Sequence, residues 1–241
     1  MISVTCPWQN WDKCATMDQM KRYAVYYAPE PGAFADAATS WLGWDPVLGR
    51  SAVQPDVGLN LAALTSEPRK YGFHGTIKAP FRLVDGGNFA TLSEAIGALA
   101  QTLPVVEMPG LEILTLDGFL ALTPTGDTTA LLDLAAKVVG NLEPLRAPLT
   151  EAETARRRPD RLTLRQRALL DLYGYPYVME EFRFHLTLSN HLSEADQAAL
   201  LPLAKNYFAT YLRQPFRINH LCLFGEALDG AFHLVHRYPL A

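Results

Sequence analysis

Two segments of the sequence share one short pattern, in which a phenylalanine precedes a histidine and a threonine follows two positions after that histidine. The segments are Phe73-His74-Gly75-Thr76 and Phe184-His185-Leu186-Thr187. With six histidines in the chain, chance alone predicts about 0.4 His-x-Thr matches, and a preceding phenylalanine makes each match rarer still. The pair therefore indicates a shared role for the two segments.

A pair of imidazole groups suits the cleavage of a phosphodiester, because that reaction needs a base at the attacking oxygen and an acid at the leaving oxygen. Histidine titrates at about pH 6.5, so a neutral copy and a protonated copy can coexist near neutrality. Thr76 and Thr187 would donate hydrogen bonds to non-bridging phosphate oxygens, and Lys78 would stabilise the charge that develops there. This chemistry requires no metal and no other cofactor. The alternative is that His74 and His185 are ordinary core histidines on half-buried strands.

Both motifs lie in segments with the composition of β-strands, residues 71–83 and 181–189. Alternate side chains of a strand point to the same face, so each segment has one polar face and one apolar face. The side chains expected on the polar faces are His74, Thr76 and Lys78 in the first segment, and Arg183, His185, Thr187 and Ser189 in the second.

The remaining pattern mixes strands and helices without the regular alternation of a doubly wound parallel sheet. Further strands are expected in the ranges 22–28, 111–122, 216–226 and 231–238, and helices in the ranges 32–44, 88–103, 128–142, 164–173 and 193–212, the last capped by Ser193. No glycine-rich phosphate loop follows the first strand. The sequence therefore predicts an α+β fold with antiparallel sheets, and the repeated motif suggests two related halves.

The composition narrows the function further. The chain has 241 residues, 49% of them hydrophobic, and a formal net charge of -4, which argues against a broad basic surface for nucleic acid. It contains no long apolar run and no signal-peptide pattern, so we expect a cytoplasmic protein. Its three cysteines fit neither a disulfide framework nor a zinc ribbon. We expect residues 1–20 to be an extension outside the fold and residues 21–241 to form a single bilobal domain.

Three stretches carry a resemblance to a known family: residues 71–81, the arginine-rich residues 156–167, and residues 174–188. They resemble the 2H phosphoesterase superfamily, and within it most closely a branch of phosphonate-metabolism proteins encoded in phosphonate-utilisation operons. The resemblance runs from about residue 21 to the end of the chain. It implies a bilobal fold with two antiparallel sheets and flanking helices around a central cleft.

The resemblance also implies metal-free chemistry on cyclic or 2',5'-type phosphodiesters, with His74, Thr76, His185 and Thr187 as the catalytic residues. It does not fix the substrate. Bacterial carbon-phosphorus bond cleavage produces 5-phosphoribosyl 1,2-cyclic phosphate, and we hypothesise that this compound is opened here. The expected partner is this small phosphorylated substrate, with no membrane and no general nucleic-acid binding, and the expected state is a monomer or weak dimer. Which histidine acts as the base is left open.

Other residues near the motifs are candidates for substrate binding. Tyr71, Tyr175 and Tyr177 could stack on a sugar or pack in the core. The arginines around Arg161 could clamp a second phosphate or form a solvated helix face. The full set of expected substrate-binding residues is Lys78, Tyr71, Arg183, Ser189, Tyr177 and Arg161.

Two other functions fit the same residues less well. A non-catalytic sensor of a phosphorylated sugar or nucleotide would need cations more than a paired acid and base. A metal-dependent hydrolase would need clustered ligands, yet His233 and His236 are three positions apart on an expected strand and so point to opposite faces.

Overall fold

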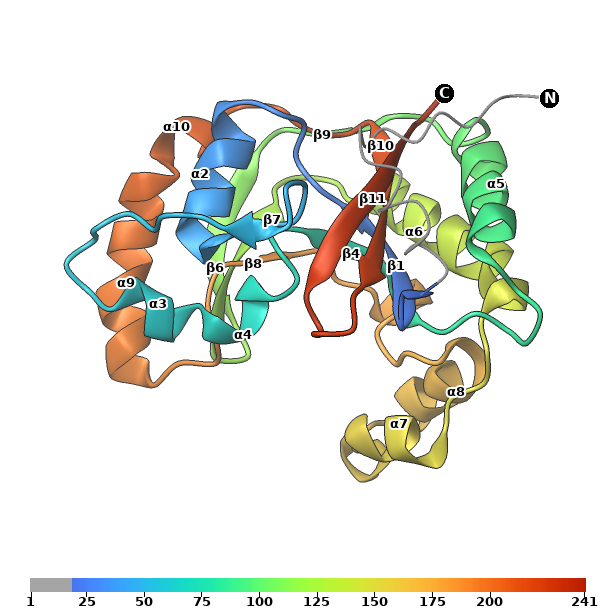
Figure 1. Ribbon diagram of the computed structural model, residues 1–241. Coiled ribbons are helices and arrows are strands. Elements are labelled where there is room, and N and C mark those ends of the chain that lie inside the picture. Colours follow the sequence, from blue (N-terminus) through green and yellow to red (C-terminus); the bar gives the residue numbers. More distant parts are fainter. Residues whose placement is uncertain (1–18) are drawn as a thin grey trace.

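One seven-stranded antiparallel sheet runs through the computed structural model, which describes residues 19–241 (Figure 1). The strands lie in the order β11 (Phe232–Pro239), β10 (His220–Glu226), β1 (Arg22–Tyr27), β4 (Gly75–Phe81), β8 (Leu186–Thr187), β7 (Phe119–Pro124) and β6 (Leu111–Leu116). The motif strands β4 and β8 are neighbours near its middle, joined through the residue pair Gly75–Leu186. The α+β class is confirmed, and the two expected sheets are joined at this pair.

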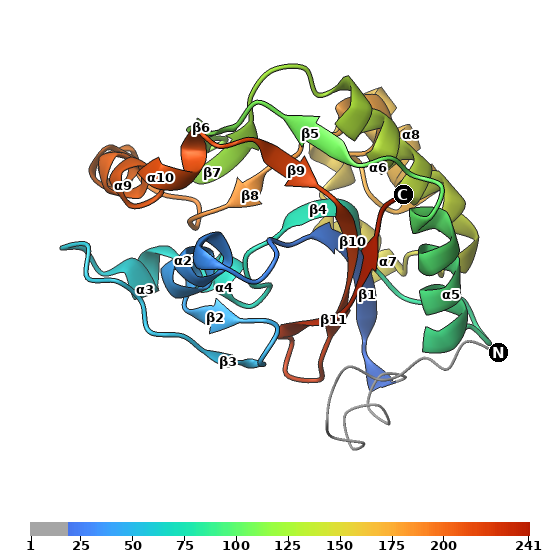
Figure 2. The ribbon, with the colours of Figure 1, turned by 90° about the horizontal axis from the view of Figure 1, so that it is seen from above.

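Helices cover the two halves of the sheet separately (Figure 2). α5 (Phe89–Ala100) packs on β10 and β11, and α6 (Thr129–Asn141) packs on β4. α9 (Glu194–Tyr207) packs on β6 and β7. The helix α9 is capped as expected, because the Ser193 side chain accepts a hydrogen bond from the Asp196 backbone N–H. This division gives the fold its two lobes, with β4 and β8 where they meet.

The shorter elements complete the two lobes. They are α2 (Ala33–Leu42), β2 (Trp44–Asp45), β3 (Arg50–Ser51), α3 (Leu61–Leu64), α4 (Ser66–Arg69), β5 (Val106–Met108), η2 (Glu143–Leu145), α7 (Glu151–Arg156), η3 (Pro159–Arg161), α8 (Leu164–Tyr173), η4 (Met179–Glu181), β9 (Phe216–Ile218) and α10 (Ala209–Leu212).

Strand β1 is buried on both faces, which explains its almost continuous apolar sequence. Tyr23 and Val25 join the main hydrophobic core. Ala24 and Tyr26 point to the other face, where they pack with Phe224 and neighbouring residues in a smaller cluster. Cys222 also lies in this smaller cluster, fully buried, as expected of a small apolar side chain.

The motif strands are shorter than the sequence pattern predicts. Regular pairing begins only at Gly75 and Leu186, so His74 and His185 each stand just before a strand. Before His74 the chain turns at Gly72, and before His185 it follows the 3-10 helix η4. The expected extension, residues 1–20, lies outside the described residues except for its last two. Among residues 19–241, no helix is long and apolar enough to cross a membrane.

Candidate active site

The two histidine-threonine motifs meet across the sheet. Gly75 pairs with Leu186 in antiparallel register, and continuing that register by one residue places His74 opposite Thr187 and Thr76 opposite His185. On that register we expect all four side chains on one face, related by a local twofold axis through the Gly75–Leu186 pair. The two histidines occupy diagonal positions, which in antiparallel sheets are roughly 7–8 Å apart. That spacing leaves room for one small anionic group between the rings.

Gly75 allows the two strands to approach this closely. A Cβ atom built on Gly75 would overlap the ring of Phe184, the residue just before His185. The aromatic residue of one motif therefore packs directly on the glycine of the other. A second glycine, Gly72, has a φ of +69° and lies against Pro46, where a side chain would also collide.

We expect Gly75→Ala to lower the free energy of unfolding by about 1–3 kcal/mol, because the added methyl group must displace the Phe184 ring. Gly140→Ala in α6 is the matched control, because nothing lies within 4 Å of a Cβ there and alanine favours a helix. Urea unfolding of both variants is the measurement, and equal stability of Gly75→Ala and the unmodified protein would contradict the packing argument.

Each histidine ring is fixed by the backbone two residues before it. His74 Nδ1 lies 2.9 Å from the carbonyl oxygen of Gly72, and His185 Nδ1 lies 2.8 Å from that of Arg183. A carbonyl oxygen only accepts, so the hydrogen of each neutral ring is on Nδ1. Nε2 of both rings is then left to take up or hold a proton for chemistry.

The surroundings of His74 favour its neutral form. Burial lowers the pKa of His74 to about 4, the hydrogen bond to the Gly72 carbonyl opposes this shift, and the charge of His185 adds to it. The His74 ring stacks on the ring of Tyr26, with centroids 3.9 Å apart, and Tyr26 is fully buried. Burial also lowers the pKa of His185, against the hydrogen bond to the Arg183 carbonyl.

A cavity of about 740 Å³ opens over the motif face. His74, Thr76 and Thr187 line it. His185 does not line it but lies beside it, where its ring is 5.5 Å from that of Phe119, a lining residue. The other lining residues are Arg22, Tyr26, Ser66, Glu67, Pro68, Lys70, Tyr71, Ala79, Pro80, Arg157, Tyr175, Ser189 and His191.

The expectation that Lys78 shares the face of His74 is wrong. The register between β1 and β4 shifts here, because Tyr26 pairs with Thr76 and Val25 pairs with Lys78. Two residues along β4 therefore correspond to one residue along β1. This irregularity turns Lys78 away from the cavity. Its ammonium is buried against α6 and η2, where Nζ lies 2.9 Å from the Glu143 carboxylate.

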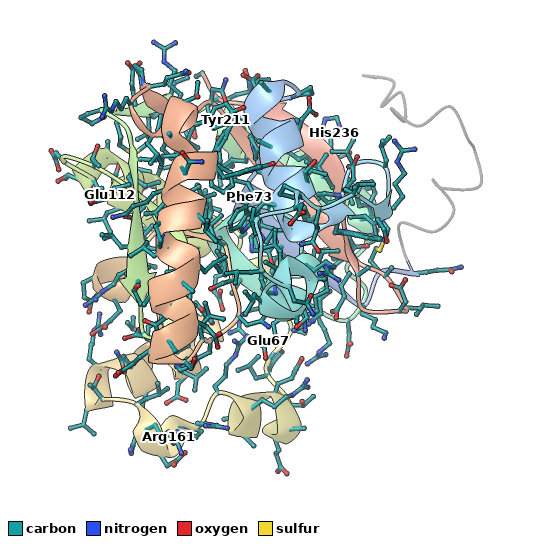
Figure 3. The ribbon with its side chains drawn as sticks, turned by 90° about the vertical axis from the view of Figure 1, so that its left-hand side faces the viewer. Glu67, Phe73, Glu112, Arg161, Tyr211 and His236 are labelled. Atoms are coloured by element: carbon teal, nitrogen blue, oxygen red, sulfur yellow. The ribbon has the colours of Figure 1, made fainter. Side chains whose placement is uncertain are left out.

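Three other expected substrate-binding residues lie away from the cavity. Tyr177 is exposed and packs on Tyr175, and Arg183 is exposed and lines a separate groove of about 220 Å³. Arg161 is exposed at the end of η3, between α7 and α8, in the lower part of Figure 3. The alternation around His185 does hold, because Arg183 is exposed between the buried Phe182 and Phe184, but Arg183 lies before β8 begins and lines another part of the surface. Tyr177 and Arg161 were predicted from sequence proximity alone.

Tyr71 and Ser189 do line the cavity. The Tyr71 ring lies 5.7 Å from that of His74, so it can contact a ligand held there. The Ser189 hydroxyl accepts a hydrogen bond from the Leu120 N–H and donates one to the Asn190 carbonyl. Ser189 therefore mainly holds the chain beside β7.

Several lining residues were not identified from the sequence. Arg22 and Tyr26 are separated by an even number of positions on β1, so strand alternation could have placed them on one face. Lys70 and His191 reach the cavity only through tertiary structure, whereas Arg157 belongs to the arginine-rich stretch that the sequence analysis considered as a phosphate clamp. Among residues 19–241, no three histidine, cysteine, aspartate or glutamate side chains gather as a metal-binding group.

Comparison with known proteins places the chain in a family. Residues 76–233 match the family described as "Protein of unknown function (DUF1045)", and the chain belongs to that family.

Two longer bacterial proteins are similar to this chain, both called "Ribose 1,5-bisphosphate phosphokinase PhnN". The one from Janthinobacterium sp. (strain Marseille) is 36% identical over 223 residues, which is 89% of this chain and 49% of that protein. The one from Laribacter hongkongensis (strain HLHK9) is 35% identical over 213 residues, 87% of this chain and 49% of that protein. The chain thus spans about half the length of these relatives.

Two solved structures are also similar. One is described as "Crystal structure of phosphoesterase", with a TM-score of 0.43 and 13% identity, covering 92% of this chain and 99% of that chain. The other is a crystal structure of E.coli LigT complexed with NADP+, with a TM-score of 0.41 and 12% identity, covering 92% of this chain and 98% of that one.

Proposed function

We propose that this protein is a metal-independent phosphodiesterase that opens a small cyclic phosphodiester by paired-histidine acid-base catalysis. The observation that carries the proposal is the pairing of Gly75 with Leu186, which brings both histidine-threonine motifs onto one face. The backbone contacts of both rings support it as well, because they leave each Nε2 available for proton transfer.

In the proposed reaction, water attacks phosphorus and His74 Nε2 takes the proton from that water. The bond from phosphorus to one ring oxygen breaks, and His185 protonates the oxygen that leaves. The product is a phosphate monoester with a free hydroxyl. Hydrogen bonds from Thr76 and Thr187 stabilise the negative charge on the non-bridging oxygens. We assign His74 as the base because burial and the charge of His185 favour its neutral form.

The proposed substrate is 5-phosphoribosyl 1,2-cyclic phosphate. A cavity of about 740 Å³ is within the range of about 300–1,000 Å³ that is usual for small-molecule sites. The two similar proteins are named for ribose 1,5-bisphosphate, and the chain matches about half of each. Breaking the bond from phosphorus to O2 of the proposed substrate would leave ribose 1,5-bisphosphate, which links the proposed product to the compound in that name.

A panel of cyclic phosphates tests this function directly. The purified protein is incubated with 5-phosphoribosyl 1,2-cyclic phosphate, ribose 1,2-cyclic phosphate and nucleoside 2',3'-cyclic phosphates, with EDTA present and phosphorus NMR as the readout. Ring opening in EDTA supports the proposal. Tight binding without turnover would favour a sensor, and turnover only after metal addition would favour a metal-dependent hydrolase.

The pH dependence follows from the two histidines. The base must be neutral, so kcat/KM should fall as pH drops through about 4, the lowered pKa of His74. The acid must be protonated, so kcat/KM should also fall as pH rises through the pKa of His185, which burial lowers from 6.5. We therefore expect a bell-shaped profile with its maximum on the acidic side of pH 6.5. A bound anion favours both imidazolium forms, so the kcat profile should lie at higher pH.

A rate that keeps rising from pH 6 to pH 9 would contradict this assignment of acid and base. Profiles measured with and without EDTA separate this effect from the titration of a bound metal ion.

A further inference from the structure

A second part of the cavity lining, which we call the second wall, comes from segments outside the motif strands and begins beside His74. Tyr71 forms its start, with its ring 5.7 Å from the His74 ring. Lys70, at the end of α4, lines the same wall, as do Arg157, which follows α7, and Tyr175, which follows α8. These four residues come from three separate segments that the fold gathers next to the proposed catalytic centre.

The wall alternates cations with aromatic faces. Lys70 Nζ lies 4.9 Å from the centre of the Tyr71 ring, and the Arg157 guanidinium carbon lies 4.8 Å from that of Tyr175. Tyr71 and Tyr175 are both half-buried and both reach the cavity, so they can contact a sugar ring.

Lys70 and Arg157 keep their charge available. Within residues 19–241, neither forms an ion pair with a carboxylate, whereas Arg22 on the same cavity is paired with Glu226. Glu67 is the carboxylate that lines the cavity, and its side chain is exposed. Two cations without carboxylate partners, beside the centre of a chain with net charge -4, create a local site for an anion.

The helix before Arg157 is held in place by contacts from the chain just after β4. Arg82, just past the end of β4, pairs with Glu153 at 3.1 Å and donates to the Pro148 carbonyl at 2.7 Å. Glu153 in turn caps α7 through Thr150, and the Arg82 guanidinium holds the pKa of the Glu153 carboxyl down to about 2. The helix that ends just before Arg157 is therefore attached to the chain that follows β4.

From these contacts we infer that Lys70 and Arg157, over Tyr71 and Tyr175, bind a phosphate monoester at the far end of the substrate. The substrate class is then a sugar with two phosphate groups, a cyclic diester between the histidines and a monoester at this second wall. Guanidinium and ammonium groups both bind phosphate through charge-assisted hydrogen bonds. This inference rests on the proposed function for the position of the cyclic group, but the monoester site can be tested alone.

Paired substrates test the inference in the catalytic assay. With 5-phosphoribosyl 1,2-cyclic phosphate, we expect Arg157→Gln and Lys70→Gln each to raise KM by about tenfold or more, the usual loss for one hydrogen bond to a charged group. With ribose 1,2-cyclic phosphate, which lacks the monoester, kcat/KM should stay within about twofold of the unmodified protein. Arg156→Gln is the matched control, because Arg156 is adjacent and exposed and bonds only to the Ala152 carbonyl among the described residues. Equal effects of Arg157→Gln on both substrates, or none on either, would overturn the inference.

A binding experiment keeps the inference testable if the protein opens neither compound. Calorimetry with ribose 5-phosphate, using ribose as the reference, measures the monoester site without the cyclic group. We expect binding of ribose 5-phosphate that is weakened about tenfold in Arg157→Gln and in Lys70→Gln, and retained in Arg156→Gln. If ribose and ribose 5-phosphate bind equally, the second wall is not a phosphate site. This conclusion holds whether or not the protein opens cyclic phosphates.

Discussion

His74→Ala and His185→Ala should each lower kcat for ring opening by about 10²–10⁴-fold, the usual contribution of one acid or base. The two rings transfer different protons but act as a unit in the same ring opening, so the double variant should be only slightly slower than the slower single variant. KM should change little in either variant, because Thr76, Thr187 and the second wall still bind the substrate. Initial rates on 5-phosphoribosyl 1,2-cyclic phosphate, followed by phosphorus NMR, provide the measurement.

His220→Ala is the control for a histidine lost elsewhere. His220 begins β10 and contacts Asn219 and Glu30 away from the cavity, so its removal should leave kcat unchanged. Full activity in both His74→Ala and His185→Ala would rule out the paired-histidine mechanism. A loss of activity in His74→Ala but not in His185→Ala would limit the catalytic role to His74, the histidine that lines the cavity.

The face shared by the two motifs could be predicted from the sequence because it depends only on the twofold alternation of a strand. His74 with Thr76, and His185 with Thr187, needed no knowledge of which strands pair. The prediction failed at Lys78, two residues further along, because the register between β1 and β4 shifts there. Pro80 was an available signal, since proline within a central strand is usual only at such irregularities.

The second wall shows another limit of prediction from sequence. The arginine-rich stretch 156–167 was visible in the sequence, but nothing in its spacing distinguishes Arg157 from Arg161. That choice depends on where α7 ends and on the Arg82–Glu153 pair that holds the helix. Lys70 contributes from a segment far from this stretch, and only the assembled fold brings the two together.

A buried ionic cluster between β4 and η2 gives the largest expected effect on stability. Lys78 is only 3% exposed, and the Glu143 carboxylate lies 2.9 Å from its ammonium and 2.7 Å from the Arg146 guanidinium. We expect Glu143→Ala to lower the free energy of unfolding by about 3–5 kcal/mol, because it leaves the buried Lys78 charge without a carboxylate partner. Lys78→Met should cost much less, since Glu143 stays paired with Arg146 and is partly exposed.

Two measurements can identify the Lys78 ammonium as the cause of the lost stability. In a double-mutant cycle by urea unfolding, adding Lys78→Met to Glu143→Ala should recover much of the lost stability. Burial already lowers the pKa of Lys78 from 10.5, and removing Glu143 removes the contact that opposes this shift. Between that lowered pKa and 10.5 the unfolded chain binds more protons than the folded one, so the stability of Glu143→Ala should rise with pH relative to the unmodified protein. If the deficit is the same at pH 7 and pH 10, and Lys78→Met does not relieve it, the loss comes from packing around η2 and not from the buried charge.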